Sequence, residues 1–528
     1  MAFNTLKGLL EKIKEYGETP AFRLKSGKNT TIDISYSRFY DEASALGAAL
    51  LKLGLKGKHV AILSGNRYEW IVSYLAIAAG TGVVVPIDRD LPDEAIIYLL
   101  KAGDVSAVLY SDAYDELIKN ADLPCLEYCI CFDGEGDENH KFLFYQKILE
   151  TGQTILKSCD NYYDEIKISE TDTAAILFTS GTTGFLKGVV LTQKNIVSNL
   201  KNATCFEPYR EREIMFSILP YHHAFECTVG LLASLANRAT ICINDSLKYL
   251  AQNFLLFKPT GMFLVPAVIY AMYKRITDAE KKLGRPLTPE EGKGVFGGRL
   301  TRIFSGSAPL NPEMILLLKT YGISLCQGYG LTETSPVVTS FKYDLLDEKN
   351  IASVGQAIVG CEVKISDGEI WVKGDNVMAG YYKNPEADSE SFEGEWFKTG
   401  DLGYIDIDGF VYVNGRKKNV IIASGGENVY PEEIEQFLLG IPMFSDSLVY
   451  GGDNGANDTV TAVIFPNYEL LEGKSESEIS AAVNAEIDAL NDKLPIYKQI
   501  LAVKIRKTPF EKTTSNKIKR NAENIKAI

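Results

Sequence analysis

The sequence predicts an α/β fold in which helices cover parallel sheets. Apolar residues recur with helical spacing from Tyr36 to Leu53, and the run Val60 to Leu63 that follows is short and fully apolar, as buried strands are. A second helical segment, Tyr68 to Ala79, leads to the apolar stretch 82–86. Alternation of this kind is typical of parallel α/β layers. With 528 residues, the chain is long enough for about three or four domain-sized units.

The composition indicates a globular protein that does not bind nucleic acid. Hydrophobic residues make up 46% of the chain and aromatic residues 10%, which provides an ample core. Acidic residues outnumber basic ones by 69 to 55, and the formal charge of −14 argues against a nucleic-acid or anionic-membrane surface. The first residues lack a charged segment followed by an apolar one, and no run of 18 apolar residues occurs. We therefore expect a cytoplasmic protein without a transmembrane segment.

Nine cysteines lie mostly in apolar surroundings, as reduced core residues do. Cys125, Cys129 and Cys131 are close enough in sequence to raise the question of a metal site. The residues between them are typical of a buried strand, however, and the chain contains no C-x-x-C pair. The structural interpretation is favoured for this cluster.

The stretch from Thr179 to Gly188 has the composition of a phosphate-binding loop between two strands. Its glycines allow positive φ and expose consecutive N–H groups, and hydroxyls and one ammonium group add further donors. A Walker A loop would place its lysine directly after the second glycine and run into a helix, which this stretch does not do. A surface turn is the alternative, and Lys187 and the density of hydroxyls argue against it. The candidate phosphate ligands are Thr179, Ser180, Gly181, Thr182, Thr183, Gly184 and Lys187.

This loop resembles the signature of the adenylate-forming, or AMP-binding, superfamily, which includes acyl-CoA synthetases, stand-alone adenylation domains and luciferases. Further matches recur from about residue 30 to the C-terminus. Leu186 stands where the family usually has proline, which removes a fixed φ but no phosphate ligand. The resemblance implies a large N-terminal domain of layered α/β subdomains (1–415), a hinge (416–419) and a small mobile α+β C-terminal lid domain (420–528).

Two segments that combine a strand end with a glycine-containing turn, 304–310 and 326–336, resemble the family's nucleotide and acyl-site motifs. In the second, Tyr329 offers a flat face on which a purine can stack. Thr332 offers a hydroxyl to phosphate or carboxylate. Glu333 offers a hard oxygen of the kind that Mg²⁺ prefers, and the resemblance makes it a metal ligand. The resemblance also assigns Ser307 and Gly330 to the nucleotide site. It makes Thr182 the second Mg²⁺ ligand.

Two matches lie around residue 400. Asp401 belongs to a segment that binds ribose in the family, and a carboxylate can accept hydrogen bonds from both ribose hydroxyls. An exposed turn aspartate is the alternative. The segment 415–419 resembles the hinge, with Arg416 directed at the nucleotide and Lys418 as the pivot.

Two matches in the small domain concern catalysis. The loop with Gly425 and Gly426 is similar to one that lines the pantetheine channel, whereas an ordinary turn before a helix is the alternative. Lys517 aligns with the family's catalytic lysine, and Asn516, which tolerates positive φ, replaces the usual glycine. Because Lys517 and Gly426 cannot both face one active site in a single orientation, we expect the small domain to rotate about the hinge between two half-reactions.

The segment 217–230 is predicted to be an apolar strand ending at Pro220, followed by aromatic and imidazole groups at the edge where α/β folds bind ligands. It is similar to the family's acyl-pocket segment, which assigns His223 to that pocket. For His222 a structural, hydrogen-bonded role is favoured. Glu226 and the following cysteine stand where many relatives that take small acids have glycine. The pattern His-His-Ala-Phe-Glu-Cys most resembles bacterial-type long-chain fatty acyl-CoA synthetases.

Together these matches predict an acyl-CoA synthetase that uses ATP, Mg²⁺ and CoA, with a fatty acid as the favoured acid. The carboxylate attacks the α-phosphorus to give acyl-AMP and pyrophosphate, and the thiol of CoA then displaces AMP. A ligase that loads a separate acyl carrier protein and an enzyme for aryl or medium-chain acids are open alternatives. The nearly complete motif set disfavours a non-catalytic acyl or nucleotide sensor. No oligomeric state is predicted. The catalytic residues would be Lys517, Glu333, Thr182 and His223.

Overall fold

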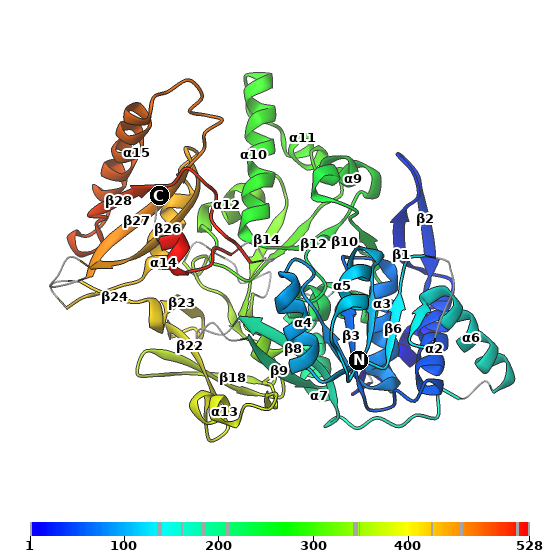
Figure 1. Cartoon of the computed structure of the whole chain (residues 1–528). Coiled ribbons are helices and arrows are strands. Elements are labelled where there is room, and N and C mark those ends of the chain that lie inside the picture. Colours follow the sequence, from blue (N-terminus) through cyan, green and yellow to red (C-terminus); the bar gives the residue numbers. More distant parts are fainter. Residues whose placement is uncertain are drawn as a thin grey trace.

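The computed structural model describes residues 3–134, 140–159, 162–180, 186–206, 209, 212–341, 347, 349–423, 426–453, 458–513 and 517–525. Two large sheets carry the N-terminal three quarters of the chain, and a smaller sheet forms the C-terminal part (Figure 1). Along the part of the chain just given, no helix combines the length and the apolar character that a membrane crossing needs.

One large sheet has eight strands and is parallel from its third strand to its last. The first two strands run antiparallel to their neighbours. In spatial order the strands are β20 (Gly380–Tyr381), β9 (Leu186–Thr192), β8 (Thr173–Ser180), β4 (Val83–Pro86), β3 (His59–Leu63), β5 (Val105–Tyr110), β6 (Tyr128–Cys131) and β7 (Phe142–Phe144).

The other large sheet has seven strands, all parallel except for the last pair. In spatial order they are β14 (Ser324–Gln327), β13 (Arg302–Ser305), β12 (Gly261–Leu264), β10 (Ile214–Ser217), β11 (Thr240–Ile243), β1 (Pro20–Lys25) and β2 (Thr31–Ser35). The sheet confirms a strand before the histidine pair, but β10 ends at Ser217, three residues before the predicted end at Pro220. The chain turns there because Pro220 has no N–H to offer a neighbouring strand.

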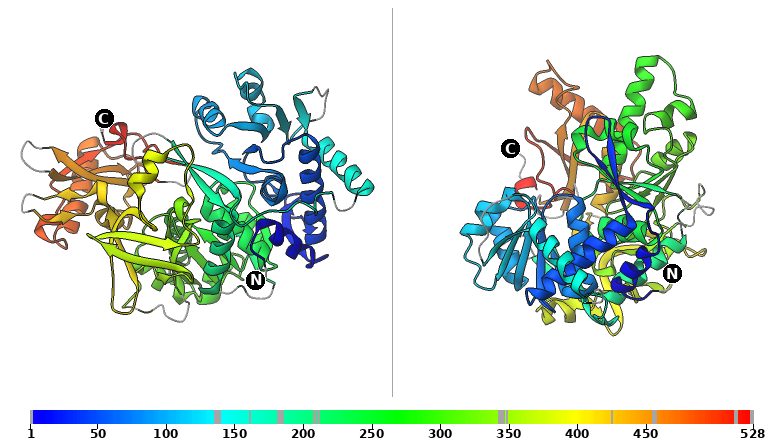
Figure 2. Two further views of the ribbon diagram at one scale, coloured as in Figure 1. Left: turned by 90° about the horizontal axis from the view of Figure 1, so that it is seen from below. Right: turned by 90° about the vertical axis from the view of Figure 1, so that its right-hand side faces the viewer.

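Helices pack on the faces of these sheets (Figures 1 and 2). The α-helices are α1 (Leu6–Lys14), α2 (Tyr36–Lys52), α3 (Tyr68–Ala76), α4 (Asp93–Ala102), α5 (Asp115–Asn120), α6 (Tyr145–Ser158), α7 (Gln193–Phe206), α8 (Ala233–Ala236), α9 (Leu250–Phe257), α10 (Pro266–Leu283), α11 (Pro289–Gly294), α12 (Pro312–Thr320), α13 (Pro385–Ser391), α14 (Pro431–Leu439), α15 (Glu476–Asn491) and α16 (Ala522–Ile525).

The predicted helix over 36–53 is confirmed as α2, and its sequence explains its limits. Ser35 caps its N-terminus by accepting a hydrogen bond from the Arg38 N–H, and the apolar face at Phe39 and Leu46 is completely buried. The predicted helix over 68–79 is α3, which ends at Ala76 and continues as a π-helical turn over Ile77–Thr81.

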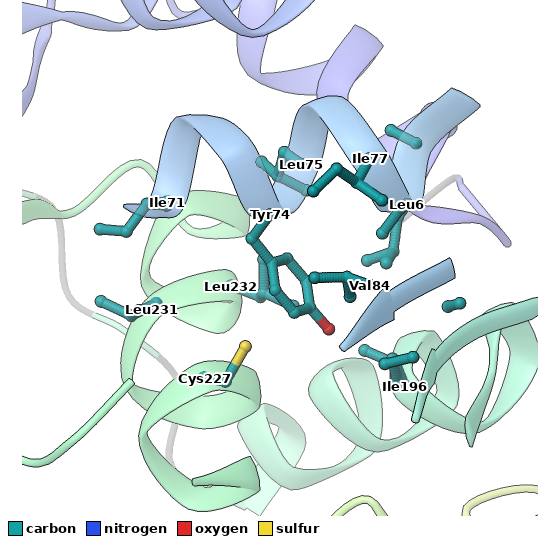
Figure 3. Close-up of a cluster of buried hydrophobic side chains, with 14 of the residues drawn as sticks. Leu6, Ile71, Tyr74, Leu75, Ile77, Val84, Ile196, Cys227, Leu231 and Leu232 are labelled. Atoms are coloured by element: carbon teal, nitrogen blue, oxygen red, sulfur yellow. The ribbon is translucent and has the colours of Figure 1, made fainter. Parts of the chain in front are cut away.

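A π-helix, η3 (Phe225–Leu232), joins the two large sheets. Figure 3 shows Ile71 and Tyr74 of α3 facing Cys227 and Leu231 of η3 inside one buried cluster. Because α3 belongs to the eight-stranded sheet and η3 follows a strand of the seven-stranded one, this packing fixes one sheet against the other. Wide helical turns of this kind occur often at functional sites, and η3 begins two residues after His223.

Three short antiparallel sheets complete the fold. Their strands are β15 (Tyr329–Gly330), β16 (Val337–Ser340) and β17 (Gln356–Ala357); β18 (Cys361–Ser366), β19 (Glu369–Gly374), β22 (Trp396–Ile405), β21 (Phe392–Glu393) and β23 (Val411–Arg416); and β24 (Ile421–Ile422) with β25 (Asn428–Val429). A one-turn 3₁₀ helix, η7 (Lys417–Asn419), follows β23.

The C-terminal part has its own sheet and its own core. Strands β26 (Phe444–Asp453), β27 (Asp458–Pro466) and β28 (Ala502–Ile505) pair in that order, and α14 and α15 supply further buried residues. The fully buried members of this core lie between Ile421 and Ile500, so they all follow η7. Figure 2 shows this part at one end of the molecule, with the N-terminal helices at the other.

Candidate active site

A cavity of about 2270 Å³ lies where the two large sheets, the β22–β23 hairpin and the C-terminal part meet. The carboxyl ends of parallel strands open into it, as expected for a ligand site in an α/β fold. Predicted site residues from distant segments of the chain line it. These are Thr179, Lys187, His223, Ser307, Tyr329, Gly330, Thr332, Glu333, Asp401, Arg416, Lys418 and Lys517.

The strands that flank the predicted phosphate loop pair as the sequence predicts. β8 and β9 are antiparallel, and Thr179 lies opposite Lys187. Both of these residues line the cavity. The Ser180 side chain, Gly181, Thr182, Thr183, Gly184 and Gly425 lie outside the described residues.

Asp401 is the centre of a buried polar cluster. Its Oδ2 accepts a hydrogen bond from the Tyr329 hydroxyl at 2.6 Å, and its Oδ1 lies 2.8 Å from Nε of Arg416. Arg416 also donates to the carbonyl of Thr399 at 3.0 Å. Burial raises the pKa of Asp401 above its usual range, and Arg416 beside it opposes that rise. Each carboxylate oxygen keeps one lone pair for a further donor, so the arrangement leaves room for two ribose hydroxyls.

Glu333 lies in a short 3₁₀ turn, Thr332–Thr334, after β15. Its Oε1 accepts a hydrogen bond from the Tyr381 hydroxyl at 3.0 Å. Along the described chain, no three His, Cys, Asp or Glu side chains gather as a metal-binding group. Mg²⁺ keeps most of its waters and is usually held by one or two carboxylates together with substrate phosphates, so the carboxylate of Glu333 at the cavity wall is a ligand of the right kind. Glu333 therefore fits the magnesium role that the sequence predicts.

His222 and His223 form one wall of the cavity, with ring centroids 4.3 Å apart. The Nε2 of His222 lies 3.6 Å from a carboxylate oxygen of Asp88. Burial lowers the pKa of both His222 and His223 to about 3, so both imidazoles are neutral at pH 7. The sequence assigned only His223 to the site, and the structure places both histidines there.

Beyond the histidines the cavity wall becomes apolar and aromatic. Phe225 lies edge-on to Phe263 with ring centroids 5.6 Å apart, and Phe263 stacks on Phe304 at 4.8 Å. The ring of Phe225 covers Gly306, because a Cβ on that glycine would approach its Cζ to 2.9 Å. The other apolar lining residues here include Leu219, Val229, Val265 and Val337. Phe263 was missed by the sequence analysis, because a phenylalanine in a buried strand looks like any core residue.

Lys517 reaches the same cavity from the C-terminal part. Its backbone N–H donates to the Thr513 hydroxyl at 3.2 Å. Desolvation by the surrounding protein, together with Arg416, lowers the pKa of Lys517 to about 8, and Asp401 opposes the shift. The side chain is accessible to solvent and opens into the cavity. Gly426 has a φ of +88° and is not among the described residues that line the cavity.

The segment predicted to be the hinge is held by carboxylates on both sides. Lys417 pairs with Glu369 at 3.0 Å, and Asn419 donates to Glu432 of α14 at 2.6 Å. Burial, with help from Arg416, lowers the pKa of Lys418. Glu369 also accepts the backbone N–H of Gly400 at 2.9 Å. The sequence analysis did not find Glu369, although a glutamate at the start of the apolar strand 369–374 was a usable signal.

Two family models together match most of the chain. The model of the AMP-binding enzyme family matches residues 9–382, and that of the AMP-binding enzyme C-terminal domain matches residues 418–525. The chain belongs to the AMP-binding enzyme family. It is therefore an adenylate-forming ligase, and the predicted fold and family are confirmed.

Individual relatives of this adenylate-forming enzyme are distant. Long-chain-fatty-acid–CoA ligase FadD15 of Mycobacterium bovis is 28% identical over 94% of this chain and 91% of its own. The crystal structure of an anthranilate CoA ligase with anthranoyl-AMP matches with a TM-score of 0.81 at 21% identity, covering 97% of this chain and 95% of that one. The structure of O-succinylbenzoate coenzyme A synthetase from Bacillus subtilis, in complex with ATP and magnesium, matches with a TM-score of 0.74 at 22% identity. The match covers 97% of this chain and 98% of that one.

Proposed function

We propose that this enzyme joins a carboxylic acid to CoA in two steps. A carboxylate oxygen attacks the α-phosphorus of ATP and pyrophosphate leaves, which gives acyl-AMP. The sulfur of CoA then attacks the acyl carbon, and AMP leaves with the electrons of the broken C–O bond. The observation that carries the proposal is that residues of the nucleotide, acyl and lysine motifs, which are far apart in sequence, line one cavity.

Each subsite has a defined task in the first step. Asp401 binds the ribose, Tyr329 stacks on the purine, and the 179–188 loop with Lys187 binds the phosphates. The carboxylate is already nucleophilic, so the step needs positioning and charge neutralisation more than a general base. Lys517 supplies a point charge where the attacking carboxylate meets the α-phosphate. When bound at Glu333 and Thr182, Mg²⁺ neutralises charge on the phosphates.

We further propose that residues 1–415 form the adenylation domain, 416–419 the hinge and 420–528 a mobile lid. Two features support this division. Among the described residues, the buried members of the C-terminal core all follow η7. Lys517 faces the cavity while Gly426 does not, so the present orientation suits adenylation and a second one is needed to bring Gly425 and Gly426 to the thiol.

The favoured acid is a fatty acid. The cavity beyond His223 is lined by apolar and aromatic side chains, and neutral histidines place no charge near an alkyl chain. The similarity to a long-chain fatty-acid ligase points the same way. The parallel rings of Phe263 and Phe304 also suit a flat aryl acid, which is the second candidate.

Pyrophosphate release distinguishes these possibilities. The enzyme would be supplied with ATP, Mg²⁺ and a panel of acids from acetate to palmitate plus benzoate-type acids, with CoA or with an acyl carrier protein as acceptor. We expect the highest kcat/KM with a long alkyl acid and with CoA. A sharp optimum at a short or aromatic acid would reject the fatty-acid assignment, and turnover only with carrier protein would reject CoA as acceptor.

A further inference from the structure

Tyr381 connects two subsites that the sequence treats separately. Its hydroxyl donates to Oε1 of Glu333 at 3.0 Å, and Nζ of Lys187 lies 5.0 Å from the centroid of its ring. The side chains of all three residues line the cavity, and Tyr381 is 9% exposed. One aromatic side chain therefore contacts both the predicted magnesium ligand and the predicted phosphate lysine.

The backbone around Tyr381 is fixed on both sides. β20 pairs with β9, the strand that carries Lys187, and Tyr381 lies opposite Val189. The N–H of Tyr381 donates to Oδ1 of Asp388 at 2.7 Å. Three residues earlier, the N–H of Met378 donates to the carbonyl of Glu333 at 2.8 Å. The ring is thus held against the turn of Glu333 and the strand of Lys187 by main-chain hydrogen bonds, independently of the hydroxyl.

The hydroxyl determines which oxygen of Glu333 is free. Oε1 accepts from Tyr381, and within the described part of the chain Oε2 accepts no side-chain hydrogen bond. A hydrogen bond to a carboxylate fixes its rotation, and partners of this kind typically change metal affinity or activity by about 10- to 100-fold when removed. The face of the ring attracts the Lys187 ammonium by a cation–π interaction, which restricts a flexible side chain.

We propose that Tyr381 is a positioning residue that holds Glu333 for the magnesium ion and Lys187 for the phosphates of the same nucleotide. The hydroxyl orients the Glu333 carboxylate, and the face of the ring positions the Lys187 ammonium. This inference rests on the proposed function of the cavity as a Mg·ATP site. It predicts that the two parts of the side chain have separable effects.

Two substitutions separate them. Tyr381→Phe removes the hydroxyl and keeps the ring over Lys187, whereas Tyr381→Leu removes both. Tyr382→Phe is the matched control, because the Tyr382 hydroxyl also donates to a carboxylate, Asp104 at 2.6 Å, and Tyr382 is not among the described residues that line the cavity. Melting temperatures of the variants show whether each is folded.

The readout is equilibrium binding of ATP, with and without Mg²⁺, measured by calorimetry on the full-length enzyme. We expect Tyr381→Phe to bind ATP alone like the wild type and to bind Mg·ATP about tenfold more weakly. Tyr381→Leu should lose affinity under both conditions, and Tyr382→Phe under neither. In activity assays Tyr381→Phe should need about tenfold more Mg²⁺ for half-maximal adenylation, with the KM for the acid unchanged.

Two results would overturn the inference. One is a Tyr381→Phe variant with wild-type affinity for Mg·ATP. The other is an equal loss with and without Mg²⁺, which would indicate a purely structural role. If Tyr381→Leu does not fold, Tyr381→Phe decides alone. Failure of the proposed function would give a different result, because the wild type would then form no acyl-AMP with any acid. The Mg·ATP affinities of the wild type and Tyr381→Phe would still test the inference about Tyr381.

Discussion

The two halves of the cavity are built on opposite principles. In the nucleotide half, charged groups hold one another at hydrogen-bond distance, as Asp401 does with Arg416 at 2.8 Å. In the acyl half, aromatic rings pack on one another, and His222 and His223 are neutral at pH 7. The first half therefore stabilises charge that develops during reaction, and the second selects a substrate by shape.

This difference predicts what substitutions do. Changes in the nucleotide half should reduce the rate for every acid, because all acids pass through the same phosphoryl chemistry. Changes in the acyl half should alter the order of preference among acids and leave ATP binding intact.

Lys517→Ala should reduce acyl-AMP formation at least about 100-fold, because loss of one preorganised group that stabilises developing charge typically costs that much. Thioester formation from supplied acyl-AMP should be largely unchanged. Pyrophosphate release measures the first step, and CoA consumption with purified acyl-AMP measures the second. The control is Lys507→Ala, which removes an exposed lysine paired with Glu476 in the same basic tail. A Lys517→Ala enzyme with near wild-type adenylation would show that another lysine is catalytic.

Lys418→Pro should retain adenylation and lose most thioester synthesis. Lys418 lies in the 3₁₀ turn η7, and 3₁₀ turns have φ values close to that of proline, so the present orientation tolerates the change. Rotation about the hinge would be blocked. Both half-reactions would be measured separately, and a proportional loss of both would contradict the two-orientation mechanism at this hinge.

Gly426 provides an independent test of the same rotation. Its φ is +88°, and no atom of the other described residues lies within 4 Å of the position that a Cβ would take, so a side chain has space among them but a strained backbone for most residue types. Gly426→Asn tolerates positive φ and adds a side chain, so it should spare adenylation and slow the thiol step. Gly426→Leu should do the same with an added loss of stability. Wild-type thioester synthesis in Gly426→Asn would remove this loop from the thiol channel.

The rate of adenylation should also depend on pH, through the charge of Lys517, and this effect should be smaller. The lowered pKa of Lys517, about 8, means that its ammonium is lost as pH rises through 8. Adenylation should fall about tenfold per pH unit above that value, while ATP binding changes less. Lys517→Arg, which stays charged, should flatten this limb even if its rate is lower. If adenylation by Lys517→Arg falls above pH 8 as steeply as in the wild type, the group that titrates there is not Lys517.

Sequence reasoning reached furthest where a residue belongs to a recognisable motif. Lys517, Asp401 and Glu333, which were singled out by their resemblance to family motifs, all line the cavity, and their roles stay predictions. The helix over 36–53 was also predictable, since its apolar spacing matches its buried face. Tyr381 and Phe263 were not predicted, because their roles arise only when strands distant in sequence pair and bring a ring to a carboxylate or to another ring.

Glu226 lies in the apolar half of the cavity, where burial keeps this ordinarily charged residue type neutral. It is 1% exposed, Oε1 accepts a hydrogen bond from the Ser217 hydroxyl at 2.5 Å, and Oε2 has no hydrogen-bond partner among the described residues. Burial raises the pKa of Glu226 to about 8, from an ordinary value of 4.5. The folded state holds this proton up to a pH of about 8, whereas the unfolded state holds it only up to about 4.5. The contribution of Glu226 to stability is therefore fully present below pH 4.5 and is lost as pH rises toward 8.

Glu226→Gln keeps the shape and removes the titration. We expect the variant to gain stability relative to the wild type as pH rises from about 5 to about 8, by about 3–4 kcal/mol, because each pKa unit corresponds to about 1.36 kcal/mol. Thermal melts at these two pH values measure this as a widening difference in Tm, with an exposed Glu472→Gln as control. ATP binding should not change. A Tm difference that is equal at the two pH values would mean that Glu226 is ionised in the folded enzyme, and the acyl half would then carry a buried charge after all.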